Sequence, residues 1–269
     1  MKSRSVESRE YKVMLQPTRF TGPEKKLLET SAEFWQDFAH TVGPFIREAD
    51  GTLDTIEKRR LIVFLDTDDR RLNESGYIFR VRRALKSGVP EVTLKFRHPD
   101  RYVAEKRLMK SPRTRAKVTF EEDVKAPFVS LYSHSGTGKV GKKSVPSHLG
   151  EIARLFPDLA KRLGKENGKR PVNEVNGFTA REVVITGAAL RIGSSLRSPV
   201  QCALIVWYDH KGSPTDPVAV EFSYRYGDQS GEYGGKTAKR AYDIFQALQK
   251  DFATWVDPNP RTKTAFVYR

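Results

Sequence analysis

Hydrophobic and polar residues alternate along short stretches of the chain, most clearly between residues 61 and 106. Three stretches there are rich in β-branched and aromatic residues: Leu61–Asp66, Tyr77–Arg83 and Glu91–Arg97. Turns rich in Asp, Asn, Gly and Pro separate them, as is typical of consecutive antiparallel strands. The pattern therefore predicts three neighbouring strands in this region.

Similar alternation predicts strands elsewhere, and apolar residues at helical spacing predict helices. The further strands are Arg9–Leu15, Val103–Met109, Lys117–Val124, Ala180–Ile192, Gln201–Tyr208 and Val218–Tyr226. The helices are Pro23–Val42, Ser147–Leu163, which Pro157 is expected to kink or divide, and Lys236–Trp255. Residues 126–176, enriched in Gly, Ser and Lys, are interpreted as a connecting insertion within a single domain of residues 1–269. We expect an α+β fold, in which flanking helices surround a closed antiparallel barrel of about eight strands.

Cationic side chains form columns on two of the central strands. Residues two apart on a strand point to the same face, so Arg80 and Arg82 share one face, as do Lys95 and Arg97. Each column alone is compatible with a strand that faces solvent. Like charges opposite one another destabilise a sheet by about 0.2–1 kcal/mol, and an anion between them would remove that cost. Two neighbouring columns therefore favour an anion site.

The succession of FLDTDD, a Gly-Tyr turn, FRVRR and VTLKFR within residues 61–106 resembles the signature of the CYTH superfamily, the triphosphate tunnel metalloenzymes. The resemblance implies an eight-stranded antiparallel barrel whose lumen is lined by Arg, Lys and Glu. It also implies that this tunnel binds a triphosphate together with a divalent metal ion, Mg²⁺ or Mn²⁺. Two metal roles would follow, namely orienting the triphosphate and activating water.

The resemblance also implies an N-terminal strand with the pattern E-x-E-x-K, whose glutamates hold metal. Here Ser8, Glu10 and Lys12 occupy that register, and Glu7 lies one residue out of phase. A one-residue shift places a side chain on the opposite face of a strand. Either Glu7 or Ser8 could thus occupy the position of the first metal-binding glutamate.

A late hairpin carries the other half of the expected site. Asp209 precedes its turn and Glu221 follows it, whereas Ala219 and Ser223 stand where a second glutamate would pair with Glu221. The resemblance thus assigns catalytic roles to Glu10, Lys12 and Glu221, and metal ligation to Glu10, Glu122, Asp209 and Glu221. Either Glu121 or Glu122 is expected to point inward. Phosphate contacts are assigned to Lys12, Arg80, Arg82, Lys95, Arg97, Arg107, Arg181 and Arg191.

Charge supports an anionic partner. The 269 residues include 48 Lys and Arg against 33 Asp and Glu, which gives a net charge of +15. Nucleic acid, an acidic membrane surface and a condensed phosphate are all compatible with that balance. The single cysteine, Cys202, excludes an internal disulfide and is expected to be a buried thiol. Without an apolar leader or a run of ~18 apolar residues, a cytoplasmic protein without membrane contact is expected.

The stretch GTGKVGKK, at residues 136–143, nearly matches a phosphate-binding P-loop. Lys143 stands in place of the metal-binding hydroxyl, and Pro146 interrupts the helix that should follow, so we interpret it as a mobile basic loop that could bind nucleic acid. Three functions remain open. The first is a metal-dependent triphosphatase acting on inorganic, nucleoside or thiamine triphosphate. The second is a non-catalytic polyphosphate or nucleotide sensor, and the third is a nucleic-acid-binding protein.

Overall fold

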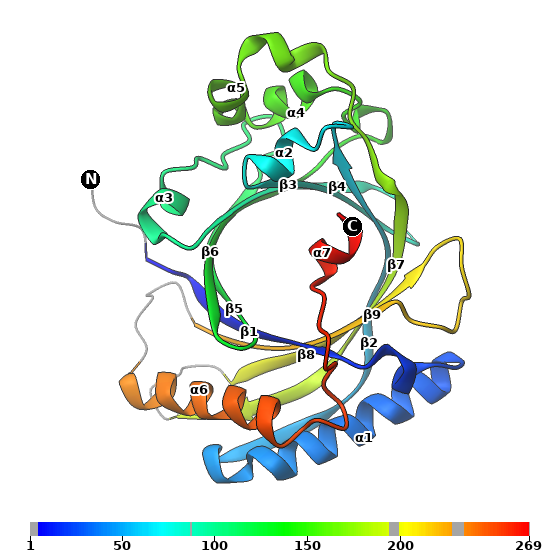
Figure 1. The fold of residues 1–269 in the computed structure, drawn as a ribbon, viewed down its shortest axis with the longest axis vertical. Coiled ribbons are helices and arrows are strands. Elements are labelled where there is room, and N and C mark those ends of the chain that lie inside the picture. Colours follow the sequence, from blue (N-terminus) through cyan, green and yellow to red (C-terminus); the bar gives the residue numbers. More distant parts are fainter. Residues whose placement is uncertain (1–4, 87, 194–198, 228–233, 269) are drawn as a thin grey trace.

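Nine strands close into a barrel at the centre of the computed structural model, which describes residues 5–86, 88–193, 199–227 and 234–268 (Figure 1). The strands are β1 Ser8–Leu15, β2 Glu48–Asp66, β3 Tyr77–Ala84, β4 Pro90–His98, β5 Lys117–Lys125, β6 Val129–Lys139, β7 Asn173–Arg191, β8 Val200–Asp209 and β9 Ala219–Tyr226. The α-helices are α1 Glu24–Val42, α2 Arg71–Glu74, α3 Arg101–Glu105, α4 Leu149–Leu155, α5 Pro157–Leu163, α6 Gly235–Lys250 and α7 Lys263–Val267. Short 3-10 helices are η1 Pro17–Phe20, η2 Gly43–Phe45, η3 Lys142–Ser144 and η4 Lys165–Lys169.

The strand order around the ring is β1-β5-β6-β4-β3-β2-β7-β8-β9. β1 closes the ring, because it pairs in parallel with β5 and antiparallel with β9. The closed α+β barrel is therefore as expected, but the described residues form nine strands rather than eight, and one pairing is parallel.

The additional strand, β6, lies in the stretch that the sequence assigned to a connecting insertion. Its Gly136 and Gly138 read as loop residues, yet both lie on the outer side of the strand, where other chain segments cross closely. A Cβ on Gly136 would stand 2.1 Å from the carbonyl oxygen of Met109, and one on Gly138 would stand 2.3 Å from Thr114 Oγ1. The glycines thus permit close packing rather than a turn.

Two further expectations fail in the same region. Residues 103–109 are not a strand, because Asp100 starts α3 by accepting hydrogen bonds from the backbone nitrogens of Tyr102 (2.7 Å) and Val103 (3.0 Å). The basic stretch 136–143 is not a loop throughout, because Gly136–Lys139 pairs with β4 and β5 as part of β6.

The apolar side of most strands faces outward, where helices cover it. Below the ring in Figure 1, α1 and α6 lie along β1, β8 and β9. Phe222 of β9 meets Phe34 and Phe38 of α1 at ring distances of 4.9 and 4.8 Å. Cys202 is buried in the same core. On the opposite side, α4 and α5 meet at Pro157, and Phe156 between them packs on Phe79 of β3.

The C-terminal segment enters the ring, and Figure 1 shows α7 inside it. Hydrogen bonds fix its end to the barrel wall. Tyr268 donates from its hydroxyl to Asp66 Oδ2 (3.2 Å), while its carbonyl accepts from Arg70 (2.9 Å). The carbonyl of Val267 accepts from Asn176 Nδ2 at 2.7 Å. The segment thus lines part of the lumen, a feature for which the sequence holds no periodic signal.

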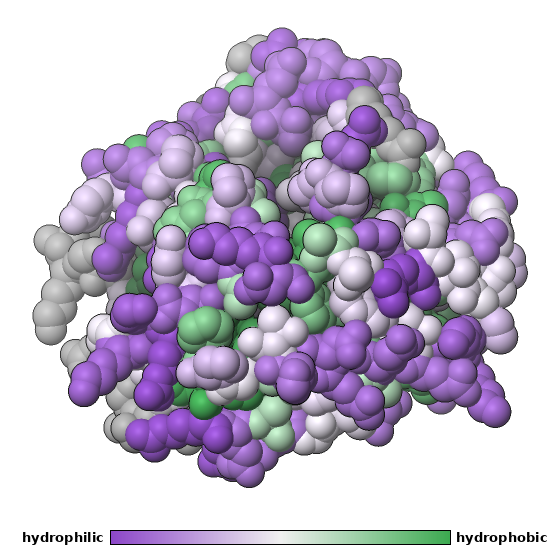
Figure 2. Space-filling model, turned by 60° about the horizontal axis from the view of Figure 1, so that its bottom comes forward, coloured by the Kyte–Doolittle hydropathy of each residue, from purple (hydrophilic) through white to green (hydrophobic). Residues whose placement is uncertain are grey.

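The side of the molecule that faces the viewer in Figure 2 is largely polar. Figure 2 shows one side of the molecule on which hydrophilic residues dominate and hydrophobic ones emerge between them. Within the described ranges, no helix is both long and apolar enough to traverse a bilayer.

Candidate functional site: the barrel lumen

A cavity of about 400 Å³ occupies the barrel lumen. The strands that line it turn their polar side inward, opposite to the apolar side that packs under the helices. Its cations are Lys12, Arg80, Arg82, Lys95, Arg97, Lys125, Arg225 and Lys263. Its carboxylates are Glu10, Glu121 and Glu221, and hydroxyls come from Thr93, Thr119, Ser135 and Thr137, together with Thr262 and Thr264 of the C-terminal segment.

The central cationic columns meet in this cavity. Arg80 and Arg82 enter from β3, and Lys95 and Arg97 from β4, because the alternate residues of both strands are apolar and point outward. Lys12 of β1 joins them. Strands distant in sequence thus supply one cationic cluster.

Asp123 of β5 is the centre of the lumenal charge network. It is fully buried, with Lys12 Nζ at 2.6 Å, Lys95 Nζ at 3.0 Å and Arg97 Nε at 3.5 Å from its carboxylate oxygens. Ser133 donates a further hydrogen bond at 2.6 Å. Burial alone would raise the pKa of Asp123, but Lys12, Lys95 and Arg97 outweigh it and hold the pKa well below its usual range.

Each of the other carboxylates that line the cavity also has a cationic partner. Glu10 lies 2.8 Å from Lys12, Glu121 lies 3.8 Å from Arg225, and Glu221 lies 3.0 Å from Lys263. No carboxylate among the lining residues is therefore left without a cation.

Glu182 of β7 is a further buried carboxylate on the inward side. It pairs with Arg60 of β2 and accepts a hydrogen bond from Trp207 Nε1 at 2.8 Å. Burial tends to raise the pKa of Glu182, but Arg60, Lys263 and Arg82 outweigh it and bring the pKa to about 2. Glu182 is consequently ionised and part of the network.

Cations exceed carboxylates around the lumen: eight cations and three carboxylates line the cavity, and the buried network beside it adds Asp123, Glu182 and Arg60. Within the described part of the chain, Arg80 and Lys125 have no ion-pair partner, and Arg80 Nε is buried without a hydrogen bond. Burial lowers the pKa of Arg80 well below its usual value, and Arg82 lowers it further. Burial and then Arg97 lower the pKa of Lys125. Such uncompensated buried charge favours an anion.

Two predicted metal ligands lie outside the cavity. Glu122 points outward, where it accepts hydrogen bonds from Arg9 (2.9 Å) and Ser130 (2.6 Å). Its neighbours Glu121 and Asp123 point inward instead. Asp209 lies at the turn after β8, where its carboxylate accepts from the backbone nitrogen of Lys211 at 3.0 Å.

Two of the predicted phosphate-binding arginines, Arg107 and Arg181, lie on the outer surface of the barrel. The Arg107 guanidinium lies 4.9 Å from the ring of Phe96, and that of Arg181 lies 4.3 Å from the ring of Tyr208. Both rings belong to the outward side of their strands. Arg107 follows α3 rather than a barrel strand. These arginines therefore act as cation–π partners of the outer wall.

Arg191 is also outside the lumen. It is exposed at the end of β7 and pairs with Glu48 (3.1 Å) and Asp50 (3.0 Å) of β2. A register shift at Gly187, whose φ is +112°, separates it from the regular part of the strand. The bulge that the glycine permits thus breaks the expected column.

A divalent metal, as the resemblance implies, does not fit the carboxylates of the lumen. Mg²⁺ binds through one or two free carboxylates together with ligand phosphates, whereas Glu10 and Glu221 are each held by a lysine. Glu221 lies opposite Met14, four residues along β1 from Glu10, which corresponds to about 13 Å at the usual rise per residue. The described residues contain no cluster of three or more His, Cys, Asp or Glu suited to a metal ion.

Several residues of this network escaped the sequence interpretation: Arg60, Asp123, Lys125, Glu182, Arg225 and Lys263. For most of them, the alternation of apolar and polar residues along the strand indicates that the side chain points inward. In β5, Val118, Phe120 and Val124 form the apolar, outward side, so residues 121, 123 and 125 face inward. For Lys263 no such signal exists, because its position depends on where the C-terminal segment enters the barrel.

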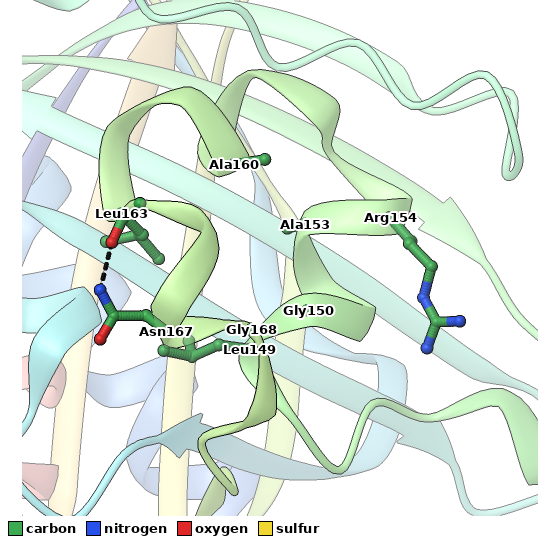
Figure 3. A pocket seen from close by; sticks show the side chains of 9 residues that line it. Leu149, Gly150, Ala153, Arg154, Ala160, Leu163, Asn167 and Gly168 are labelled. Carbon is green, nitrogen blue, oxygen red and sulfur yellow. Dashed lines mark hydrogen bonds between the residues drawn. The ribbon is translucent and has the colours of Figure 1, made fainter.

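A second, smaller cavity of about 240 Å³ lies among α4, α5 and η4, outside the barrel (Figure 3). It is lined mainly by small and aliphatic residues, and the Arg154 side chain points away from it in Figure 3. Asn167 beside it donates its side-chain amide to the carbonyl of Leu163. The charged groups thus distinguish the lumen as the candidate functional site.

Lys95 provides a test of the charge in the lumen. Burial lowers its pKa to about 8, because the attraction of Asp123 does not offset burial together with Arg97 and Lys12. A lysine in the unfolded chain keeps its proton to about pH 10.4. Between these values the unfolded state binds more protons, so this lysine makes stability rise with pH, by up to about 1.4 kcal/mol per pH unit.

The measurement is urea denaturation of the wild type and Lys95→Met from pH 7.5 to 10. The free energy of unfolding of the wild type should rise relative to that of Lys95→Met across this range. Parallel curves for the two proteins would show that Lys95 keeps an ordinary pKa.

Comparison with known proteins gives matches among solved structures alone: no protein-family model and no curated protein sequence matches the chain. The chain is similar to a "putative adenylyl cyclase" from Hippeastrum, described as having a dominant triphosphatase activity, with 12% identity and a TM-score of 0.47. That match covers 97% of this chain and 95% of the other. "Putative adenylate cyclases" from Bacillus halodurans (13% identity, TM-score 0.39) and Vibrio parahaemolyticus (10%, 0.36) each match over 98% of this chain and 99% of their own.

The observed barrel meets the structural expectation drawn from the central strands. It is closed, its lumen is lined by Arg, Lys and Glu, and the FRVRR and VTLKFR strands lie side by side within it. The fold thus agrees with the architecture that the resemblance to the CYTH superfamily implies.

Proposed function

We propose that the lumen binds a linear, multiply charged oxyanion of the triphosphate class. Such a ligand could be inorganic triphosphate or the triphosphate group of a nucleotide or of thiamine triphosphate. The observation that carries the proposal is the excess of inward cations over carboxylates, in which Arg80 and Lys125 form no ion pair with any described residue. Buried unpaired ions are costly, and a polyanion would compensate several of them at once.

The size of the cavity supports a slender ligand. Its volume of about 400 Å³ is at the lower end of the range of small-molecule sites. Lumenal hydroxyls such as Thr93, paired with Thr137 at 2.9 Å, add neutral hydrogen-bonding groups. A nucleic-acid duplex does not fit such a space, so any binding of nucleic acid would use the outer surface.

Binding is supported more strongly than metal-dependent hydrolysis. The metal roles assigned from the sequence to Glu10 and Glu221 would require both carboxylates to release their lysines. Of the three functions that the sequence left open, the anion-binding tunnel without a metal centre is therefore the best supported. Hydrolysis by a triphosphatase is the alternative that phosphate release would reveal.

Calorimetric titration with tripolyphosphate, orthophosphate, ATP and duplex DNA tests the proposal, with phosphate release measured in parallel. Tripolyphosphate should bind at least about a hundredfold more tightly than orthophosphate, because its added phosphates can each form hydrogen bonds with charged groups worth about 1.5–3 kcal/mol. The double variant Lys142→Met/Lys143→Met, changed at exposed lysines outside the lumen, is the control and should bind tripolyphosphate normally. Equal affinity for both phosphates, or loss of binding in this variant, would contradict a lumenal triphosphate site.

A further inference from the structure

The C-terminal segment places an ammonium group on a lumenal carboxylate. Lys263 Nζ lies 3.0 Å from Glu221 Oε1, and the side chains of Lys263 and Glu221 are only 16% and 8% exposed. The same ammonium lies 5.5 Å from the centre of the Trp207 ring. A buried pair of this kind is difficult to separate, because each partner left alone would be an uncompensated charge.

Lys263 is held in place by the structure around it. Thr262 caps α7 by accepting a hydrogen bond from the backbone nitrogen of Ala265 at 3.2 Å. Arg97 of the barrel wall donates to Thr264 Oγ1 at 3.3 Å. Before Lys263, the backbone nitrogen of Asp257 donates to the carbonyl of Met14 in β1 at 2.9 Å, and beyond it Tyr268 is fixed, so the segment is tied to the wall on both sides of Lys263. The Lys263 ammonium is thus held at a fixed position in the lumen.

Lys12 of β1 pairs with lumenal carboxylates in the same way. Its ammonium lies 2.8 Å from Glu10 and 2.6 Å from Asp123. Burial would lower the pKa of Lys12, but Asp123 and Glu10 outweigh it and raise the pKa. Two lysines from opposite ends of the chain therefore neutralise the carboxylates that a metal ion would need.

We infer that the tunnel binds its triphosphate ligand without a divalent metal ion, with Lys263 and Lys12 neutralising Glu221 and Glu10 in place of the metal. The inference rests on the proposed function. A metal that bound Glu221 would have to displace Lys263, which would then lack a carboxylate in a buried position. Mg²⁺ in solution would instead bind the free polyphosphate, reduce its charge and compete with the protein.

Calorimetric titration with tripolyphosphate, in EDTA and in excess Mg²⁺, tests the inference. The wild type should bind at least as tightly in EDTA as in Mg²⁺. Lys263→Met should bind about tenfold or more weakly in EDTA, because one cation is lost and Glu221 is left to repel the ligand. Mg²⁺ should restore part of that affinity, because Glu221 is then free to hold the ion.

Two further variants control the result. Lys250→Met removes an exposed lysine at the end of α6 and should behave as the wild type. Lys263→Met/Glu221→Gln keeps the net charge of the lumen, so it should recover most of the affinity in EDTA and show no gain with Mg²⁺. This double variant leaves no unpaired carboxylate, which keeps the test possible if Lys263→Met alone fails to fold.

The outcomes separate the two proposals. Wild-type binding that requires Mg²⁺ would overturn the inference while leaving a triphosphate site. Unchanged affinity in Lys263→Met would overturn the role of Lys263. A wild type that binds no tripolyphosphate in either condition would instead contradict the proposed function itself.

Discussion

Replacing Arg80 with methionine is expected to weaken tripolyphosphate binding by about a hundredfold or more and to stabilise the ligand-free protein. Arg80 points into the lumen without an ion-pair partner among the residues that the structure describes, and its Nε is buried there without a hydrogen bond. Two hydrogen bonds from its guanidinium to phosphate oxygens, at about 1.5–3 kcal/mol each, account for a loss of this size. Without ligand, the same group is an uncompensated charge, so its removal should raise the free energy of unfolding by about 1–3 kcal/mol.

The opposite signs of the two effects are the informative part. Replacing a residue that merely supports the barrel would lower both the stability of the protein and its affinity for the ligand. Replacing a ligand-binding residue that destabilises the empty protein would lower the affinity alone. Calorimetry and urea denaturation of Arg80→Met measure the two quantities separately. Arg83→Met, at an exposed position three residues along the same strand, is the matched control and should change neither quantity much. A destabilised Arg80→Met that binds tripolyphosphate normally would contradict this role.

Sequence pattern could predict the parts of the site that lie on regular strands. Arg80, Arg82, Lys95 and Arg97 alternate with Phe79, Val81, Leu94 and Phe96, so their common side is readable once the strands are recognised. In this barrel the apolar side of a strand meets helices and the polar side meets the lumen. The usual association of apolar residues with the interior of a barrel is therefore reversed.

That reversal accounts for two of the misplaced residues. Arg181 shares its side of β7 with Val183 and Ile185, which pack in the outer core, and it is consequently outside. Glu122 has Phe120 and Val124 on its side of β5 and is likewise outside. Applied consistently, the alternation would have placed Asp123 rather than Glu122 in the lumen.

Other features depend on contacts that no local pattern encodes. β6 has the composition of a loop, and its strand character comes from pairing with β4 and β5 while another segment crosses its glycines. Lys263 reaches Glu221 only because the last residues of the chain enter the barrel. Such positions follow from tertiary packing, which overrides local propensity.

Asp123→Asn is expected to reduce the stability of the ligand-free protein by about 3–5 kcal/mol, the usual consequence of removing one partner from a buried ionic network. Lys12, Lys95 and Arg97 would then face one another without the carboxylate that they share. Urea denaturation measures the loss. Glu48→Gln, which removes a carboxylate from an exposed pair with Arg191, is the control and should have little effect because such pairs contribute little.

Tripolyphosphate should raise the free energy of unfolding of the Asp123→Asn variant more than that of the wild type. The variant has one negative charge fewer in the lumen, so the ligand meets less repulsion and binds more tightly. A ligand that binds only the folded state stabilises that state in proportion to the logarithm of the ligand concentration divided by Kd. At the same saturating concentration, the difference in unfolding free energy between variant and wild type should therefore shrink. If the difference is unchanged by ligand, the carboxylate and the phosphate do not share the same cations. A smaller difference in the presence of ligand would show that the polyanion can replace the Asp123 carboxylate as the partner of the same lumenal cations.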